Sequence, residues 1–210
     1  MKINKPLITL LLLAAGSISY AKAQLSTFHD PISFKLKNGM NIIIAENTGT
    51  SKVYSTFAAD DTDAEQITPT QTIINVMLNE IALNTHSGIS FNDKGGNLNN
   101  SIAGFENALL ELSSCIINAD LNKDLFEKAK SAVLKSVHDR LKYYPSTMTE
   151  NSVEAITLEE VKAHFHNKYQ PAKASLTIAG NITPSEAKNV AKKAFGSWKG
   201  NQVESSSISR

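Results

Sequence analysis

The side chains that could do chemistry in this sequence begin with its five histidines. Histidine is the common zinc ligand and the common base of hydrolases. His164 and His166 stand two apart, so on a helix they point about 200° apart and do not share a metal as an i, i+4 pair would. His138 stands alone, and His29 lies in an N-terminal extension. The sequence contains no Gly-x-Ser-x-Gly motif, so it gives no indication of a serine hydrolase. Because the histidines show no metal-binding spacing either, we interpret them as surface residues.

Two further groups could carry chemistry, an acidic cluster and a lone cysteine. The run Asp60–Gln66 holds four acids but lacks the glycine and the terminal glutamate of a calcium-binding loop, so it predicts a solvated loop. Cys115 is the only cysteine, which excludes an internal disulfide. Its helical spacing from Ala108 and Leu112 predicts a buried, apolar role rather than a reactive thiol.

The best-marked elements of the chain lie between Ile156 and Gly200 and form a helix, a strand and a second helix. Thr157 and Glu160 have the capping-box spacing that opens a helix. The half-buried strand Ala174–Ala179 follows, with alternating polar and apolar residues. A second capping box at Thr183, with proline in the first helical position, opens the last helix. These boundaries predict a packed unit rather than a linker.

Upstream of this unit, apolar periodicity predicts four more strands and three more helices. Asn38-Gly39 lies between the first two strands and is a strong signal for a tight hairpin. The expected strands are Phe34–Leu36, Met40–Glu46, Val53–Ala59 and Asn97–Ala103, and the expected helices are Thr68–Asn84, Phe105–Ile116 and Asn122–Leu141. Together with the C-terminal unit they predict an α+β fold, in which helices pack on one face of a mostly antiparallel sheet of four to six strands.

Two stretches of the chain resemble a known family. They are FKLKNGMNIIIAEN, from Phe34 to Asn47, and ITLEEVKAHFHNKYQPAKASLTIAGNITPSEAKNVAKKAFGSWKG, from Ile156 to Gly200. Both are similar to parts of one structural repeat of the insulinase/pitrilysin family of zinc metallopeptidases, which includes the mitochondrial processing peptidase. The resemblance implies one insulinase-like repeat. Whole enzymes of this family close several such repeats around an extended peptide, so one repeat is not expected to form that chamber alone.

The resemblance also implies where the family's chemistry would lie. Active members carry His-x-x-Glu-His on the helix that corresponds to Thr68–Asn84, with two zinc-binding histidines and a glutamate that activates water. In this sequence the two histidine positions hold Asn75 and Asn79, and the glutamate position holds Leu78. The counterpart of the third ligand is Ser136. We therefore expect an inactive homologue with no catalytic, cofactor-binding or metal-binding residues, and zinc only in a partner subunit.

The middle of the chain is shorter than the family's pattern. Ser87–Lys94 resembles the remnant of a helix, and the strand Asn97–Ala103 is followed almost at once by a helix. Only Gly104 remains where the family has another strand. This predicts a sheet that lacks one strand, with an open edge or an uncovered apolar patch. Such features favour association with a partner.

The N-terminal residues predict export. Met1–Ala23 has a basic start, an apolar run at Leu7–Ala15 and a small-x-small cleavage site before Gln24, as a signal peptide does. The apolar run is too short to span a bilayer as a helix. We expect cleavage after Ala23, no membrane span in the mature chain, and a periplasmic or secreted protein. An uncleaved membrane anchor is the alternative.

Charge and length limit the remaining possibilities. Removal of the leader takes away three lysines and no acid, so the formal charge changes from +1 to −2. No basic stripe indicates a nucleic-acid partner. Residues 24–200 are long enough for one buried core, which predicts a single domain. Residues 201–210 are polar and serine-rich, and predict a disordered tail.

Three functions fit these observations. The first is a non-catalytic, peptide-binding partner of a zinc peptidase, paired with a second insulinase-like subunit or with another copy of itself. The second is a scaffold or binding module without protease activity, as in the respiratory-complex relatives of the family. The third is a degenerate relic without function. Stable folding of the mature chain would count against the third, and failure to capture any peptidase would count against the first.

Overall fold

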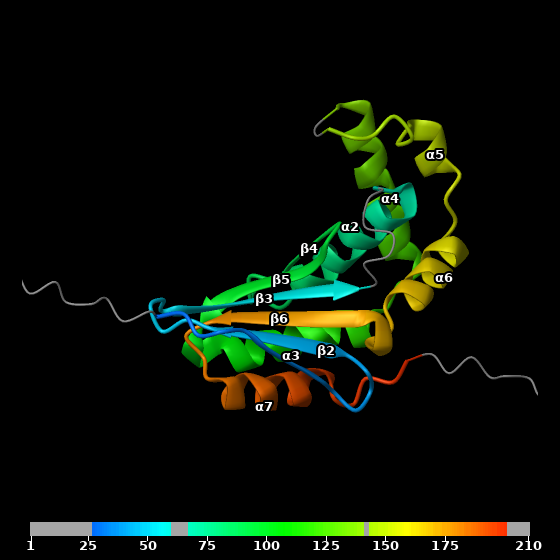
Figure 1. Ribbon diagram of the computed structural model, residues 1–210. Helices are drawn as coiled ribbons and strands as arrows, with labels where there is room; N and C mark the ends of the chain where they lie inside the picture. Colours follow the sequence, from blue (N-terminus) through cyan, green and yellow to red (C-terminus); the bar gives the residue numbers. More distant parts are fainter. Residues whose placement is uncertain (1–26, 60–66, 141–142, 201–210) are drawn as a thin grey trace, which may run out of the picture.

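The computed structural model describes residues 27–59, 67–140 and 143–200. Its centre is one six-stranded sheet with the strand order β1-β2-β6-β3-β5-β4 (Figure 1). The strands are β1 (Ile32–Lys35), β2 (Asn41–Glu46), β3 (Lys52–Ala59), β4 (Ser90–Asn92), β5 (Gly95–Ser101) and β6 (Ala174–Gly180). β2 and β6 run parallel, and the other neighbouring strands are antiparallel. The predicted α+β fold with a mostly antiparallel sheet is confirmed.

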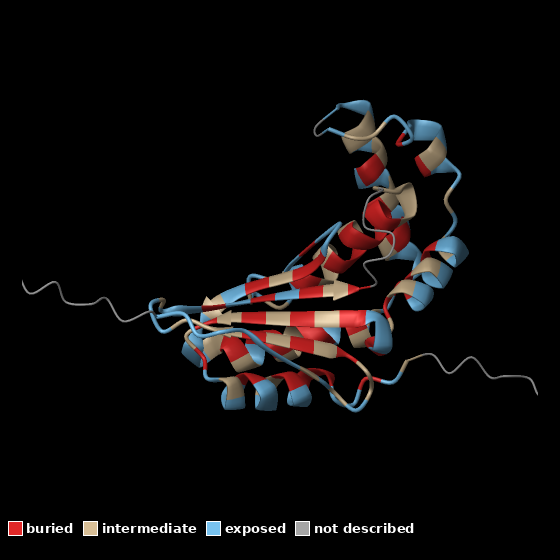
Figure 2. Cartoon of the chain, viewed as in Figure 1, coloured by how far each residue is buried: buried red, intermediate tan, exposed pale blue. Residues whose placement is uncertain are grey.

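The helices form two groups. α3 (Ile102–Ile117) and α7 (Pro184–Phe195) lie against one face of the sheet, and Figure 2 shows their buried residues turned toward it. The second group extends beyond one end of the sheet as a helical arm (Figure 1). This helical arm consists of α2 (Pro69–Leu83), α4 (Lys123–His138), α5 (Glu150–Glu154) and α6 (Leu158–Lys168).

The helix starts follow from the capping residues in the sequence. Thr157 and Glu160 form the predicted capping box of α6, and Thr183 and Glu186 form that of α7. In each box the threonine side chain accepts from a backbone N–H while the glutamate binds the threonine, which satisfies donors that the first turn leaves unpaired. Hydrogen bonds from Thr157 lower the pKa of Glu160, and those from Thr183 lower the pKa of Glu186.

An aromatic cluster closes the core beneath the sheet. Phe57 on β3 is fully buried, and its ring lies 6.1 Å from Tyr169, 5.8 Å from Phe195 and 6.0 Å from Trp198, measured between centroids. Phe165 stacks on Tyr169 at 4.4 Å. These residues come from β3, α6 and the end of α7, so the cluster joins the sheet to both helix groups. Each buried aromatic ring removes a large apolar area from water, so the cluster is a substantial part of the core.

Several predicted elements need correction. Ser87–Lys94 is not the remnant of a helix, because Ser90–Asn92 pairs with Gly95–Asn97 as the antiparallel strand β4. The turn requires Gly95, whose φ is +122° and whose missing Cβ would lie 2.0 Å from Phe57 O. Because Gly95 allows this close approach to β3, β5 begins at Gly95, two residues before the predicted start at Asn97.

The other differences concern helix boundaries. β5 ends at Ser101 rather than at Ala103, because the Ser101 side chain caps α3. α4 ends at His138, two residues before Arg140, whose φ of +51° leaves the helical region. The short helix α5 was not predicted.

Three predicted segments lie outside the described residues. They are the signal peptide 1–23, the acidic run 60–66 and the tail 201–210. The boundary of the domain at residue 24 and the site of cleavage therefore stay predictions. Among the helices of the described residues, none combines the length and the apolar character needed to cross a bilayer.

Candidate functional site

Helix α2 carries the positions that the family resemblance assigns to zinc chemistry. Leu78 is fully buried in the core, and Asn75 is only 6% exposed. Asn79 lies one turn after Asn75, and its side-chain nitrogen Nδ2 donates to the backbone carbonyl oxygen of Asn75 at 2.8 Å. The helix therefore presents carboxamides to its surroundings at both predicted histidine positions, and a hydrocarbon to the core at the predicted glutamate position.

Asn79 binds the backbone of the edge strand β4. Its Nδ2 donates to Phe91 O at 2.8 Å, and its Oδ1 accepts from Phe91 N at 2.8 Å. In an antiparallel ladder one residue turns both of these groups to the same side. The carboxamide thus replaces a peptide group of the strand that β4 lacks on its outer side. Asn79 holds the edge of the sheet against α2.

Asn75 belongs to a second set of hydrogen bonds. Its Nδ2 donates to Asp93 Oδ1 at 2.8 Å, and its Oδ1 accepts from Gln71 Nε2 at 2.8 Å. Gln71 Nε2 also lies 3.4 Å from the hydroxyl of Tyr169, and Gln71 Oε1 lies 3.3 Å from His164 Nε2. We call Gln71, Asn75, Asn79 and Asp93 with these partners the carboxamide network. It connects α2, α6 and the β4–β5 turn.

The buried environment of Tyr169 keeps its phenol neutral. Burial raises the pKa of the Tyr169 phenol to about 12, partly offset by the hydrogen bond to Gln71. Tyr169 is therefore a neutral phenol throughout the physiological range. The amides and the phenol are poor ligands for zinc, and none of them accepts a proton near pH 7. The carboxylate of Asp93 and the imidazole of His164 each face an amide of the network, Asn75 and Gln71 respectively. What this arrangement does is fix one turn and one edge strand.

The structure places the remaining predicted residues apart from this network. Ser136 lies on α4, where its hydroxyl accepts a hydrogen bond from the Tyr144 hydroxyl at 2.9 Å. Within residues 27–59, 67–140 and 143–200, no three His, Cys, Asp or Glu side chains gather as a metal site would require. Cys115 is buried in α3, and burial raises the pKa of its thiol, with a further contribution from Glu111. The buried position predicted for Cys115 is confirmed.

The histidines have separate partners. His164 faces Gln71 on α2, whereas His166 Nδ1 donates to Lys162 O, 2.8 Å away within its own helix. The two imidazoles diverge as their spacing predicts. His138 does not stand alone, because its Nδ1 lies 3.1 Å from Glu150 Oε1 on α5.

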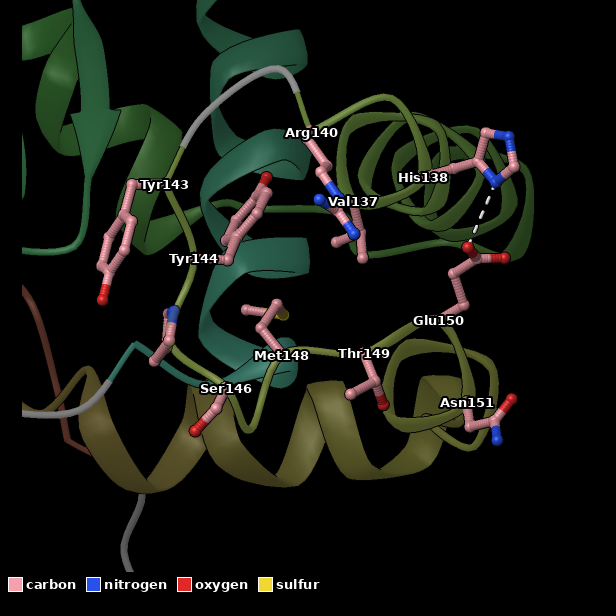
Figure 3. A pocket seen from close by; sticks show the side chains of 11 residues that line it. Val137, His138, Arg140, Tyr143, Tyr144, Ser146, Met148, Thr149, Glu150 and Asn151 are labelled. Atoms are coloured by element: carbon pink, nitrogen blue, oxygen red, sulfur yellow. Dashed lines mark hydrogen bonds and ion pairs between the residues drawn. The ribbon is translucent and has the colours of Figure 1, made fainter.

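A hollow of about 1070 Å³ separates the end of α4 from α5 (Figure 3). At one end of it His138 Nδ1 lies 3.1 Å from Glu150 Oε1, and Tyr143 lies at the other end. Arg140 and Tyr144 also line it. These five side chains all carry polar groups, so the hollow suits polar binding. It shows no nucleophile bonded to a base, which acyl transfer needs.

Within the described ranges, the second face of the sheet carries no helix, and its centre holds no charged side chain. Two rows of neighbouring residues cross the strands. The first row is Ile43, Thr177, Thr56 and Asn97, and the second is Ala45, Ala179, Tyr54 and Asn99. All eight residues are exposed or half-buried, and Tyr54 is 46% exposed. We call these two rows the open face.

One edge of the sheet is also incomplete. β4 pairs only with Gly95–Asn97, so Leu98–Ser101 of β5 has no strand on its outer side among the described residues. A small hollow of about 190 Å³ lies beside this stretch and reaches Tyr54 and Thr56 of the open face. This is an open edge of the kind that the shortened sequence predicts. Whether it marks the loss of a strand from the family's pattern stays a prediction.

The carboxamide network was not predicted, although the sequence contains a signal for it. Gln71, Asn75 and Asn79 recur every four residues on a helix that is rich in apolar residues. A polar stripe within an apolar face indicates buried hydrogen bonds. Their partner Asp93 had no signal, because its position depends on the strand that was mistaken for a helix.

Comparison with known proteins supports the fold. Residues 155–210 match the model of the peptidase M16 inactive domain, M16 being the insulinase/pitrilysin family. No curated protein matches the sequence.

Several solved structures share this fold at low sequence identity. A protease from Helicobacter pylori shares 15% identity at a TM-score of 0.67, over 81% of this chain and 51% of its own. The periplasmic protease PqqL from Escherichia coli shares 10% sequence identity at a TM-score of 0.69, and the match covers 82% of this chain and 24% of PqqL. The peptidase M16 inactive domain from Pseudomonas fluorescens shares 16% sequence identity at a TM-score of 0.66, and the match covers 82% of this chain and 51% of that one.

This chain therefore spans about half, or about a quarter, of the solved chains that it matches. The match to the inactive domain covers the C-terminal helix–strand–helix unit, and the shared fold covers most of the rest. The resemblance inferred from the sequence is confirmed: this chain has the fold of a single insulinase-like M16 peptidase repeat, and its C-terminal part is similar to the inactive domain of that family.

Proposed function

We propose that this chain is a non-catalytic subunit of an insulinase-like peptidase assembly, to which it contributes a wall and a surface for extended peptides. The observation that carries this proposal is the open face, two uncharged rows of side chains that no helix of the described residues covers. The rows combine apolar and aromatic side chains with neutral hydroxyls and carboxamides. Another protein or a peptide can therefore cover this face without burying a charge, which would be costly.

The extent of the match is consistent with further repeats. The residues described here cover 51% of one solved chain and 24% of another. One repeat provides one wall, so a closed chamber needs further repeats. The partner we propose is a second insulinase-like chain with an intact zinc motif; a homo-oligomer is the alternative.

The assignment of the motif positions supports placing the chemistry in that partner. Carboxamides at Asn75 and Asn79 are poor zinc ligands, Leu78 cannot carry a proton, and Ser136 replaces the third ligand. The carboxamide network gives these residues another role, since it binds α2 to β4. We propose that zinc is held by the partner only.

The open edge at Leu98–Ser101 supports peptide binding. An extended peptide can add to such an edge through backbone hydrogen bonds, with alternate side chains entering neighbouring hollows. The hollow beside Tyr54 and Thr56 lies within reach of alternate side chains of an added strand. The leader predicted at Met1–Ala23 would place this function in the periplasm or outside the cell. PqqL, with which the chain shares its fold, is a periplasmic protease.

Affinity capture tests the proposal. The tagged mature chain is recovered from its native cell envelope and its companions are identified by mass spectrometry. We expect a chain that carries intact His-x-x-Glu-His, and we expect the purified mature chain alone to hold no stoichiometric zinc. One tightly bound zinc per chain would refute the assigned motif positions.

Two matched variants test the surface. Thr56→Glu places a charge at the centre of the open face and should abolish capture without changing the melting temperature by more than a few degrees. Asn189→Glu places the same charge on the exposed side of α7 and should leave capture intact. Recovery of unrelated chains only, or equal capture by both variants, would favour a scaffold role and contradict the proposal.

A further inference from the structure

A second hollow, distant from the open face, combines an aromatic floor with unpaired cations. It encloses about 540 Å³ between the end of α3, the helix α6 and the segment after α7. This volume is in the range of small-molecule sites. Its apolar lining comes from Ile116, Ile117, Ala119, Leu121, Phe165, Tyr169 and Trp198.

The floor of this hollow is rigid. Phe165 stacks on Tyr169, and Trp198 packs against Phe57 and Phe195 of the aromatic cluster. Phe165, Tyr169 and Trp198 are each at most 7% exposed, so the core fixes their positions. A preformed apolar floor lowers the entropy cost of binding, because little has to be ordered when a ligand enters.

The polar groups at the rim favour an anion. Lys162 and Lys199 line the hollow, and neither ammonium group has an ion pair or hydrogen bond within the described part of the chain. The indole N–H of Trp198 likewise donates no hydrogen bond to a described residue. The one carboxylate at the rim is Asp120, which already accepts a hydrogen bond from Asn122 at 2.9 Å. The rim thus offers more positive charge and more donors than it uses.

We propose that this hollow binds a single carboxylate attached to an apolar body. The apolar body would rest on Phe165, Tyr169 and Trp198, and the carboxylate would lie between Lys162 and Lys199. Charge-assisted hydrogen bonds from ammonium groups are stronger than neutral ones, so the carboxylate orients the ligand. Two sources offer this chemistry, a free acid such as a medium-chain fatty acid and the C-terminal residue of a peptide with an apolar side chain. The inference does not rest on the proposed function, because it uses neither the open face nor a partner.

The fluorescence of Trp198 tests this inference directly, because Trp198 is the only tryptophan of the chain. Purified full-length mature protein is titrated with octanoate and, as a neutral control, with 1-octanol. We expect a saturable change with octanoate and a dissociation constant on the order of 10⁻⁵ to 10⁻⁴ M, and much weaker binding of octanol. A second pair of probes is a tetrapeptide ending in Leu-Phe, with either a free or an amidated C-terminus. If the free-acid peptide binds more tightly than octanoate, the natural ligand is a peptide C-terminus; if octanoate binds more tightly, it is a free acid.

Charge variants connect the response to the rim. Lys162→Gln and Lys199→Gln should each weaken carboxylate binding about three- to tenfold, while Lys192→Gln, an exposed lysine of α7 outside the hollow, should change nothing. Ala119→Phe, which fills the hollow, should remove the response with the rim intact. Equal binding of octanoate and octanol, no saturable response to any probe, or equal effects of all three lysine variants would overturn the inference.

Discussion

The aromatic cluster and the carboxamide network stabilise neighbouring parts of this molecule in opposite ways. The cluster consists of apolar rings around Phe57, whereas the network consists of amides around Asn75 and Asn79. Tyr169 belongs to both, because its ring stacks on Phe165 and its hydroxyl meets Gln71. Tyr169 thus lies at the boundary between a region stabilised by apolar packing and a region stabilised by buried hydrogen bonds.

The difference shows what each part can tolerate. Apolar packing is not directional, so neighbours partly refill a lost contact, and the cost depends on the size of the remaining cavity. A buried amide needs every partner, since one unpaired buried group costs its desolvation energy. The network therefore fixes a specific position for β4, while the cluster contributes apolar burial at the centre of the core. Three substitutions test this contrast, in order of decreasing effect.

Removal of the central ring should have the largest effect. Phe57→Ala leaves a cavity between Tyr169, Phe195 and Trp198, and should lower the free energy of unfolding by about 3–5 kcal/mol. Urea unfolding, followed by circular dichroism, measures this. Leu83→Ala is the matched control, because Leu83 is 68% exposed and should cost about 0.5 kcal/mol or less. Similar losses in both variants would mean that Phe57 is not the centre of the core.

Loss of the Asn79 carboxamide should have an intermediate effect with a local signature. Asn79→Ala leaves both backbone groups of the buried Phe91 without a partner and should cost about 2–3 kcal/mol. Amide hydrogen exchange should accelerate at Phe91 and its neighbours in β4, and remain slow in β6. Asn84→Ala, an exposed carboxamide at the end of α2, should leave both measurements unchanged. Uniformly faster exchange over the whole sheet would contradict a local role.

Tyr169→Phe should have the smallest effect at neutral pH and a reversed effect in alkali. Only a 3.4 Å hydrogen bond is lost, so the cost at pH 7 should be about 0.5–1 kcal/mol. The folded pKa of Tyr169 is raised to about 12, so its contribution is complete below the unfolded pKa near 10 and disappears as the pH rises toward 12. Over this pH range the free energy of unfolding of the wild-type protein should fall by on the order of 2 kcal/mol relative to that of the variant.

The two stability curves should therefore cross. Urea midpoints measured between pH 7 and pH 12 would show this, with wild-type protein the more stable at neutral pH and the variant the more stable in alkali. Parallel curves over the whole range would mean that Tyr169 ionises equally well in the folded and unfolded states. That result would contradict the burial of the Tyr169 hydroxyl between the cluster and the network.

Local sequence determined the C-terminal unit almost completely. The capping boxes at Thr157 and Thr183 and the alternation in Ala174–Ala179 are interactions between near neighbours, so the chain needs no distant partner to specify them. The same holds for the hairpin at Asn38-Gly39, where Gly39 has a φ of +90°. The positions that correspond to the zinc ligands were also predicted from the sequence through the family resemblance, and they remain a prediction.

Only the tertiary structure decided the region around β4. The pairing of Ser90–Asn92 with Gly95–Asn97 depends on the bonds of Asn79 to Phe91 and of Asn75 to Asp93, which join residues 12 and 18 apart. Three residues carry too little periodicity to predict a strand. The hollow between Lys162 and Lys199 likewise exists because α6 and the segment after α7 meet at the aromatic cluster. Periodicity and caps act within a few residues along the chain, whereas binding surfaces arise where distant segments pack, and only the folded chain brings those segments together.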